Sequence, residues 1–515
     1  MMANNHPNIL FIMTDEHAAG VTGFAGDPYV KTSNLDKLAS RSVQFDTATC
    51  PSPLCTTSRM CMLTGKEVHH CAAWSNHWVI FPEHTTWPGH FAEHGYTTCL
   101  VGKMHFGGKN QMQGFQYRPY GDLRHGLGHQ PDPISMFPGY ACARSAGPTE
   151  IPESLLQDVV VTRETLSFLR EHHDARPQNP WFVCASYSRP HPPFTAPGRY
   201  IRRYRDKIPP ADISAVRAGT MEPYAVSYMD HFTDLTPEES LRGREGYYAC
   251  VDFVDDCIGE LLDGLENDGL LENTIIIYTS DHGEMLGQHG LWGKAVYYNP
   301  AVAVPLLMTG PGIKPGHTQV THPVSLMDLF PTTAALAGLP VPEGLDGVDV
   351  SPVLAEPDTT ASPRDYAPCS YYKYGGLVHL GKNPNQEDQP HEAWRSVRDE
   401  RYKYVDIEGG AALLFDLQED PNEQVNLAEH IHHKIRCQAM RTALQQDFSW
   451  AAAHVQLAED RARLPSFKSG LTPSTPNQYR LPDGRTFDAE GDLYGARWLS
   501  LPEDTSGGII PQQFG

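Results

Sequence analysis

The segment around residues 50–66 places a cysteine, Cys55, four residues before an arginine, Arg59, with short hydroxyl residues between them. If a helix begins near Cys55, these two side chains lie one turn apart on the same helix face. The cysteine then lies at the positive end of the helix, where anions bind. A nucleophile beside an arginine at this place suits attack on a sulfate or phosphate ester. The alternative is a buried cysteine in an amphipathic helix.

Four apolar runs each end in polar residues of types that do chemistry. Residues 8–14 precede Asp15 and Glu16, residues 97–101 precede Lys103 and His105, residues 181–187 precede His191, and residues 274–279 precede Asp281 and His282. Short apolar runs bounded by turn signals are typical of buried, mostly parallel strands. Helical patterns between the runs, as in residues 247–265, indicate an α/β domain. Ligands bind at the carboxyl ends of such strands, so we expect the four clusters to meet.

Two adjacent pairs of residues have the chemistry of metal ligands: Asp15 with Glu16, and Asp281 with His282. Three carboxylates and an imidazole could hold one divalent cation at two strand ends. Such a cation would polarise an ester and activate a nucleophile. Either pair alone is also explained by a helix cap. The occurrence of both pairs after strands of one chain favours the metal site.

The Cys55 segment resembles the maturation signature of type I sulfatases, which runs Cys-x-Pro-Ser-Arg and is followed by Thr-Gly. The matching residues are Cys55, Ser58, Arg59, Thr64 and Gly65. Thr57 departs from the signature, because the family usually has proline or alanine there. In that family a maturation enzyme oxidises the cysteine to formylglycine, whose hydrate becomes the nucleophile. The resemblance therefore implies a formylglycine at position 55 and a formylglycine-generating enzyme as a partner.

The resemblance to sulfatases and to the alkaline phosphatase superfamily extends to the proposed metal site. By position it implies one divalent cation, usually calcium in this family, and manganese in its phosphonate-hydrolysing subgroup. The implied ligands are Asp15, Glu16, Cys55 after modification, Asp281 and His282. His282 stands where many sulfatases have asparagine, which points to the subgroup of choline sulfatases and phosphonate monoester hydrolases.

Three further motifs of the family have counterparts in this chain. Residues 102–105 resemble Gly-Lys-x-His, residues 190–192 begin a Pro-His-x-Pro motif, and residues 287–294 resemble Gly-x-x-Gly-Leu-x-x-Lys. The resemblance implies that Lys103 binds the anionic oxygens, His105 orients the nucleophile, His191 contacts the substrate, and Lys294 contacts the leaving-group oxygen. With Cys55 and Arg59 these residues form the expected catalytic set. A surface lysine or structural histidine is the alternative for any one of them.

The first functional hypothesis is a metal-dependent sulfatase that cleaves a small alkyl or aryl sulfate monoester. The second is a phosphonate monoester or phosphodiester hydrolase on the same site, because the two kinds of anion are similar in shape and charge. The third is a non-catalytic anion-binding relative, for which Thr57 is the only support. An aromatic cage of Trp74, His77, Trp78 and Trp87 could hold a quaternary ammonium group, but such residues more often belong to the core.

The composition of the 515-residue chain limits its partners and its location. The formal net charge of −22 argues against nucleic acid as a partner, because that partner requires a basic surface. Eleven scattered cysteines without a CxxC pair fit a reducing cytoplasm better than a disulfide framework. We find no signal peptide and no apolar stretch long enough to span a membrane.

The sequence predicts three parts. Residues 1–365 form a catalytic α/β domain with a large mixed, mostly parallel sheet between helices. A proline-rich stretch at residues 351–368 marks the boundary to a small α+β domain at residues 366–463. Residues 394–405 predict an antiparallel hairpin in this small domain, and a helix is expected to end near residue 463. Residues 464–515 are expected to be an extended tail that contacts a neighbouring subunit of a homo-oligomer, either a dimer or a tetramer.

Overall fold

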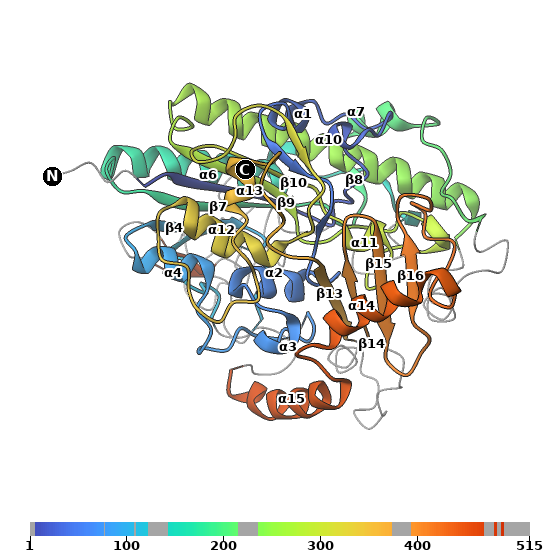
Figure 1. The fold of residues 1–515 in the computed structure, drawn as a ribbon. Helices are drawn as coiled ribbons and strands as arrows, with labels where there is room; N and C mark the ends of the chain where they lie inside the picture. The colour runs from blue at the N-terminus through green and yellow to red at the C-terminus, as the bar shows by residue number, and fades with distance from the viewer. Residues whose placement is uncertain are drawn as a thin grey trace.

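The computed structural model describes residues 6–76, 78–107, 110–121, 143–214, 235–372, 393–467, 478–480 and 486–488. A mixed sheet with the strand order β11-β2-β10-β9-β1-β7-β4-β5 lies at its centre (Figure 1). Its strands are β11 (Thr318–Val320), β2 (Val43–Phe45), β10 (Leu306–Thr309), β9 (Thr274–Ser280), β1 (Asn8–Asp15), β7 (Trp181–Pro190), β4 (Thr97–Gly102) and β5 (Tyr117–Tyr120). Among the described strands of this large sheet, only β10 runs antiparallel to its neighbours. The expected mixed, mostly parallel sheet is confirmed.

The register of the central strands aligns their carboxyl ends. Thr14 on β1 pairs with Ser280 on β9, and Gly102 on β4 pairs with Ser186 on β7. The residues that follow these strands therefore lie at the same edge of the sheet. This alignment explains why four segments distant in sequence can build one site.

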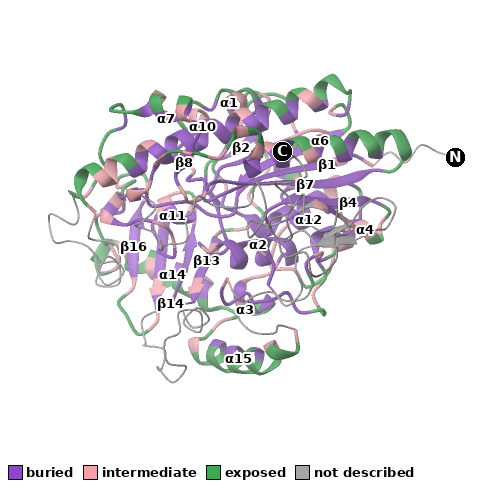
Figure 2. Ribbon diagram, turned by 180° about the vertical axis from the view of Figure 1, so that it is seen from behind, coloured by how far each residue is buried: buried purple, intermediate pink, exposed green. Residues whose placement is uncertain are grey.

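Alternate residues of β1 enter two different cores, because successive side chains of a strand point to opposite faces. Ile9, Phe11 and Met13 pack with α2 (Cys55–Thr64), α4 (Trp87–Glu93) and α12 (Leu329–Leu336). Leu10 and Ile12 pack with α1 (Ser33–Ala39), α6 (Gln157–Ala175), α7 (Gly198–Tyr204) and α10 (Pro237–Asn267). Figure 2 shows the resulting layers, with the buried sheet between two helical layers. The strand is buried on both faces, as a continuous apolar run predicts.

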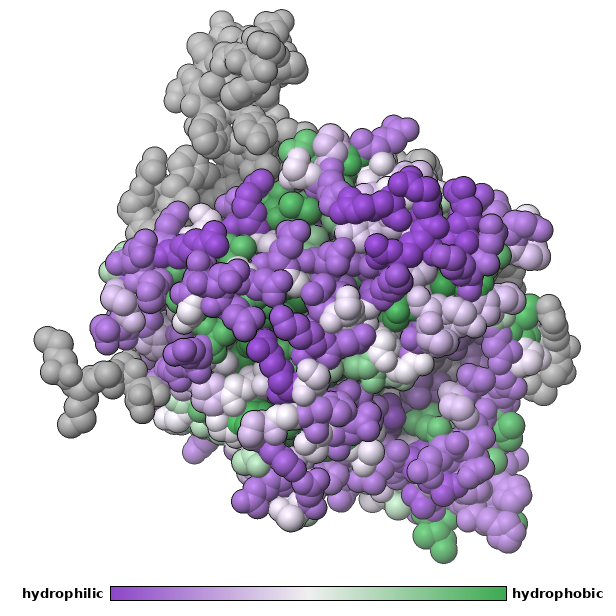
Figure 3. All heavy atoms as spheres, turned by 90° about the horizontal axis from the view of Figure 1, so that it is seen from above, coloured by the Kyte–Doolittle hydropathy of each residue, from purple (hydrophilic) through white to green (hydrophobic). Residues whose placement is uncertain are grey.

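The 31-residue helix α10 covers one face of the sheet and includes the predicted helical stretch 247–265. A capping box of Thr236 and Glu239 and a proline in the first turn fix its start. The surface over α1, α6, α7 and α10 is largely hydrophilic, with only scattered apolar residues (Figure 3). In the described part of the chain, no helix combines the length and apolar content that a membrane crossing needs.

A second, antiparallel sheet comprises β13 (Ala367–Tyr372), β14 (Ala393–Arg398), β15 (Tyr402–Ile407) and β16 (Leu413–Asp416). The predicted hairpin at 394–405 corresponds to β14 and β15. Helix α14 (Lys434–Gln445) packs on one face of this sheet. Helix α15 (Trp450–Arg463) follows α14 in the chain and lies outside the small sheet (Figure 1). The proline-rich stretch before β13 contains one short helix, α13 (Ser351–Ala355). Two further short α-helices in the described residues are α3 (Val68–Cys71) and α11 (Asn299–Val302).

The tail predicted at residues 464–515 lies mostly outside the described residues. Two short strands within it, β17 (Gln478–Arg480) and β18 (Thr486–Asp488), pair antiparallel. Strand β17 lies beside β5 at the edge of the large sheet of its own chain. The expected contact with a neighbouring subunit remains a prediction.

Candidate active site

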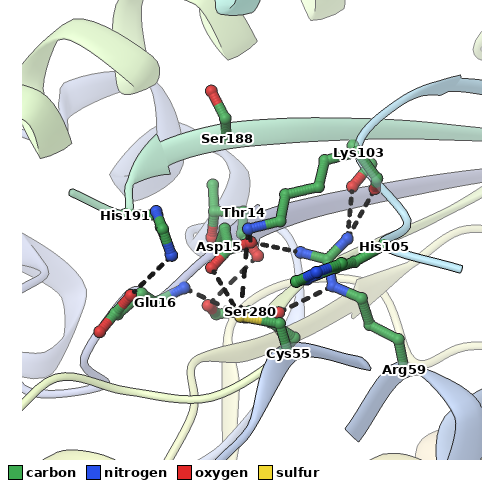
Figure 4. A network of polar contacts seen from close by, with 12 residues as sticks. Thr14, Asp15, Glu16, Cys55, Arg59, Lys103, His105, Ser188, His191 and Ser280 are labelled. Carbon is green, nitrogen blue, oxygen red and sulfur yellow. Dashed lines mark hydrogen bonds and ion pairs between the residues drawn. The ribbon is translucent and has the colours of Figure 1, made fainter. Parts of the chain in front are cut away.

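Helix α2 begins at Cys55, so the sulfur lies at the helix N-terminus, as the sequence predicts. Gly65 ends the helix in the left-handed conformation, with a φ of 64°, and all ten helical residues are buried. The helix points its first turn at the aligned ends of β1, β4 and β9 (Figure 4). Thr57 lies in this first turn and is buried, and its hydroxyl has no hydrogen-bond partner in the described part of the chain. The departure from the family signature therefore leaves the helix start intact.

The Cys55 sulfur is the centre of the site. It lies 3.2 Å from Nε2 of His282 and 3.2 Å from Nζ of Lys294. Oδ1 of Asp15 is 3.7 Å away and Nζ of Lys103 is 4.0 Å away. The expected meeting of strand ends is thus present: residues from β1, β4, β9 and two loops surround one side chain.

Arg59 is completely buried and joins the strand ends to one another. Its Nε donates to Oδ2 of Asp281 at 2.7 Å, and its Nη2 donates to Oδ2 of Asp15 at 2.9 Å. Its Nη1 donates to the backbone carbonyl of Lys103 at 2.6 Å. All of these partners belong to the protein, so Arg59 acts here on the carboxylates rather than on an open substrate pocket.

Four buried residues have ligand atoms that lie within 4.8 Å of one another: Asp15, Cys55, Asp281 and His282. The Nδ1 of His282 donates to the carbonyl of Gly283 at 2.9 Å, which orients the ring so that Nε2 faces the site. Two carboxylates, an imidazole and the side chain at position 55 are a donor set that fits a divalent cation. The chemistry of these four residues therefore fits the divalent cation that the sequence implies.

Glu16 occupies a second position, next to this group of four. Its carboxylate lies 2.7 Å from Nζ of Lys294 and 3.5 Å from Nε2 of His191. Ligand atoms of Asp15, Glu16 and His191 also lie within 4.8 Å of one another. Burial raises the pKa of Glu16 well above its ordinary value, with Lys294 opposing the shift and Glu284 adding to it.

The charges around Cys55 favour its ionised form. Burial alone would raise the pKa of the thiol, but Lys103, Lys294 and His282 outweigh it and hold this pKa well below its ordinary value. Burial also acts to raise the pKa of Asp15, whereas neighbouring positive charges, Lys103 foremost, lower it to about 2. Both pKa shifts therefore favour the negatively charged forms of Asp15 and of the Cys55 thiol.

His105 and His191 approach Cys55 from two different loops (Figure 4). The His105 carbonyl accepts a hydrogen bond from the Thr56 hydroxyl at 2.9 Å, which ties the end of β4 to the start of α2. The Nδ1 of His191 donates to the carbonyl of Pro192 at 2.7 Å, so its Nε2 faces the site. The two proposed sets share Cys55 and comprise ten residues, all of which fall at this one place: Asp15, Glu16, Cys55, Arg59, Lys103, His105, His191, Asp281, His282 and Lys294.

Two buried carboxylates in the surroundings were not predicted from the sequence. Oδ1 of Asp158, on α6, accepts the backbone N–H groups of Ser188 at 3.0 Å and Arg189 at 3.1 Å, and so fixes the end of β7 directly before His191. Oε1 of Glu284 accepts the N–H of Gly293 at 2.6 Å, directly before Lys294. Glu284 could have been recognised from its place two residues after His282, whereas Asp158 lies in the first turn of α6, where an acidic residue is already explained by the helix N-terminus.

The aromatic residues after α2 belong to the core. Trp74, Trp78 and Trp87 are 1%, 2% and 0% exposed. The indole N–H of Trp74 donates to Oδ2 of Asp460 at 2.8 Å. These three rings therefore offer no open cage, in agreement with the core alternative, and His77 lies outside the described residues.

Comparison with known proteins places these observations in a family. Residues 7–339 match the family described as Sulfatase. Residues 287–449 match a second family model, which is described as the C-terminal part of N-sulphoglucosamine sulphohydrolase. The chain is 30% identical to a choline-sulfatase of Rhizobium meliloti, over 83% of this chain and 84% of that protein. It is 27% identical to an arylsulfatase of Clostridium perfringens, over 85% of this chain and 93% of that protein.

Solved structures of low sequence identity share the fold. The phosphonate monoester hydrolase of Agrobacterium radiobacter matches with a TM-score of 0.68 and 23% identity, over 94% of this chain and 99% of that chain. A protein solved with its substrate, D-glucosamine-2-N,6-O-disulfate, matches with a TM-score of 0.69 and 22% identity, over 88% and 98% of the two chains. From the extent of the family match and the identity to its members, this chain belongs to the sulfatase family, the sulfuric ester hydrolases of the alkaline phosphatase superfamily.

Proposed function

We propose that this protein hydrolyses a small alkyl or aryl sulfate monoester through a formylglycine derived from Cys55. The supporting observation is the position of the Cys55 side chain, at a helix N-terminus, between the Asp15 carboxylate, His282 and the Lys294 amine. Amines on one side can bind an anionic ester, while carboxylates on the other can bind a cation. Such a site suits attack on a sulfur centre that carries negative oxygens.

Two groups complete the proposed site. A divalent cation, with calcium proposed and manganese as the alternative, would supply Lewis-acid charge when held by Asp15, Glu16, position 55, Asp281 and His282. Glu16 is included because its ligand atom lies within 4.8 Å of that of Asp15. A hydrated formylglycine would supply one hydroxyl for attack and a second hydroxyl that allows the aldehyde to be regenerated. The formylglycine-generating enzyme is the proposed partner in maturation.

The protein's own side chains perform the remaining tasks. Lys103 and His191 bind the equatorial sulfate oxygens, and Lys294 stabilises the negative charge that develops on the leaving oxygen. His105 accepts a proton from the side chain at position 55. Arg59 holds the carboxylates of Asp15 and Asp281 in place, because it donates to both of them.

A second reaction on the same site, hydrolysis of phosphonate monoesters or phosphodiesters, is favoured by the Asp281-His282 pair. A tetrahedral anionic ester of phosphorus presents the same charge and shape to Lys103, Lys294 and His191. The two activities are separated by a panel of an aryl sulfate, choline sulfate, a phenyl phosphonate ester and an aryl phosphodiester. The largest kcat/KM identifies the main activity.

The mass of the proteolytic peptide that spans Cys55 tests the proposal, using protein made in its native host. We expect the aldehyde, together with sulfatase activity that a chelator removes and calcium or manganese restores. An intact thiol with activity would indicate a Cys55 thiolate nucleophile, which the lowered pKa of Cys55 permits. An intact thiol without activity would contradict hydrolysis and favour a non-catalytic anion-binding protein.

We further propose a cytoplasmic location, supported by the free state of every cysteine that the structure describes. We also propose the domain limits 1–365, 366–463 and 464–515, supported by the start of the small sheet at Ala367 and the end of α15 at Arg463. Assembly into a dimer or tetramer through the tail is the proposed role of residues 464–515. Light scattering of the full chain and of a chain truncated at residue 465 tests this role.

A further inference from the structure

The residue that follows Lys294 is held from two sides. Ala295 has a φ of 76°, in the left-handed region that non-glycine residues rarely adopt. Its carbonyl accepts the indole N–H of the fully buried Trp394 at 3.2 Å. Its own N–H donates to the carbonyl of Pro53 at 3.2 Å, two residues before Cys55. Lys294 and the nucleophile position are thus connected through one backbone unit that Trp394 fixes.

A buried ion pair holds the same segment a few residues further on. The amine of Lys403, on β15, donates to the carbonyl of Tyr297 at 2.6 Å and to Oδ1 of Asn299 at 3.0 Å. Lys403 also pairs with Glu423, whose Oε2 accepts the N–H of Asn299 at 2.6 Å. Lys403 and Glu423 are 1% and 2% exposed. Removal of either partner would leave the other as an unpaired buried charge, which is costly. We therefore expect the Lys403–Glu423 pair to hold the backbone of residues 297 and 299 in place.

The ion pair of Lys403 and Glu423 lies on the side of the small sheet that faces the catalytic domain. Tyr402 and Tyr404 pack with the core of the small domain beside α14, whereas Val405 belongs to the main core. Lys403 shares a strand face with Val405, since alternate residues of a strand face the same way. The face of β15 that meets the main core therefore carries the lysine that bonds the segment after Lys294.

We propose that Lys403, together with Glu423 and Trp394, is a positioning residue for Lys294. The small antiparallel sheet thereby sets the place of the Lys294 amine, 3.2 Å from the Cys55 sulfur. This inference rests on the proposed function, in which Lys294 stabilises the negative charge on the leaving oxygen. A displacement of about 1 Å at a catalytic group can lower a rate by about 100-fold.

The double variant Lys403→Met/Glu423→Gln tests this proposal, because it removes the ion pair without leaving a lone buried charge. The matched control is Arg395→Met/Glu67→Gln, which removes a partly buried ion pair between the small sheet and the catalytic domain that makes no bond to residues 294–299. The measurement is kcat and KM for a series of aryl sulfates with leaving groups of different pKa, corrected for formylglycine content.

We expect kcat of the Lys403 and Glu423 variant to fall by about 10- to 100-fold for the poorest leaving groups and less for the best, with KM nearly unchanged. Trp394→Phe should give a smaller effect of the same kind, and Lys403→Arg should restore much of the rate. The control should lose thermal stability without a change in the dependence on leaving group. An equal loss of kcat for every ester in the Lys403 and Glu423 variant would contradict positioning.

Amide hydrogen exchange of the peptide covering residues 291–299 gives a readout that does not require activity. Exchange should be faster in the Lys403 and Glu423 variant than in the native sequence and the control. If the native protein hydrolyses no sulfate ester, the proposed function fails, and exchange alone then decides whether the small sheet holds this segment. Unchanged exchange in the variant would overturn the inference, whatever the activity.

Discussion

At the scale of single residues, Arg59 connects the two buried aspartates of the site. Its guanidinium is fully buried and bonds Asp15 and Asp281 at once. Arg59→Ala should leave two buried carboxylates without this partner and lower the free energy of unfolding by about 3–5 kcal/mol. Chemical denaturation in the presence of a chelator measures the loss. The control is Lys37→Ala at the exposed ion pair with Asp263, which should cost less than about 1 kcal/mol.

A buried histidine far from the site should make stability depend on pH. Burial lowers the pKa of His172 to about 4, and its Nε2 has no hydrogen-bond partner in the described part of the chain. Because the unfolded chain binds this proton more readily, the group destabilises the fold as pH falls from 6.5 toward 4.

His172→Leu should therefore weaken the decrease of the urea midpoint between pH 7 and pH 5. The control is His430→Gln at an exposed histidine. In this variant the urea midpoint should decrease between pH 7 and pH 5 as much as in the native chain. A variant at His172 with an unchanged pH dependence would show that other groups dominate acid destabilisation.

At the scale of elements, the junction of β4 and β7 depends on a glycine. Gly102 has a φ of 96°, and a Cβ added there would lie 2.1 Å from the backbone oxygen of Ser186. Gly102→Ala should separate the two strand ends, displace Lys103, lower stability by more than about 2 kcal/mol and reduce kcat/KM at least tenfold. Gly95→Ala is a matched control, because Gly95 has a φ of 89° with no atom within 4 Å of such a Cβ. It should cost about 1–2 kcal/mol and keep full activity.

The sequence allows prediction of those elements whose side chains repeat with a clear period. The apolar run before Asp15 and the hairpin at 394–405 are such cases, and the rule for strand ends then places the polar clusters together. The contacts of Lys403 with residues 297 and 299 and of Asp158 with the His191 loop could not be predicted. They depend on the packing of distant elements, and a lysine in a strand or an aspartate in a helix is ordinarily a solvated charge. The antiparallel direction of β10 likewise has no local signal.

At the scale of the whole molecule, the proposed cation should couple the two halves of the large sheet to one another. Its ligands come from β1, from the loop after β9 and from α2, so binding requires these elements to be folded together. Ligand that binds only the folded state stabilises it, by about 2.7 kcal/mol at a free concentration of 100 times Kd. Calcium or manganese added to the chelated protein should therefore raise the melting temperature.

The variant His282→Ala separates this effect from ions bound elsewhere on an acidic chain with a net charge of −22. It removes one ligand and should abolish most of the calcium-dependent rise, measured by scanning calorimetry at fixed ionic strength. The control is Asp263→Asn, which removes an exposed carboxylate that pairs with Lys37 on the surface and should keep the rise intact. A rise that persists in His282→Ala would mean that cations stabilise the protein by neutralising surface charge, because screening does not depend on a buried imidazole.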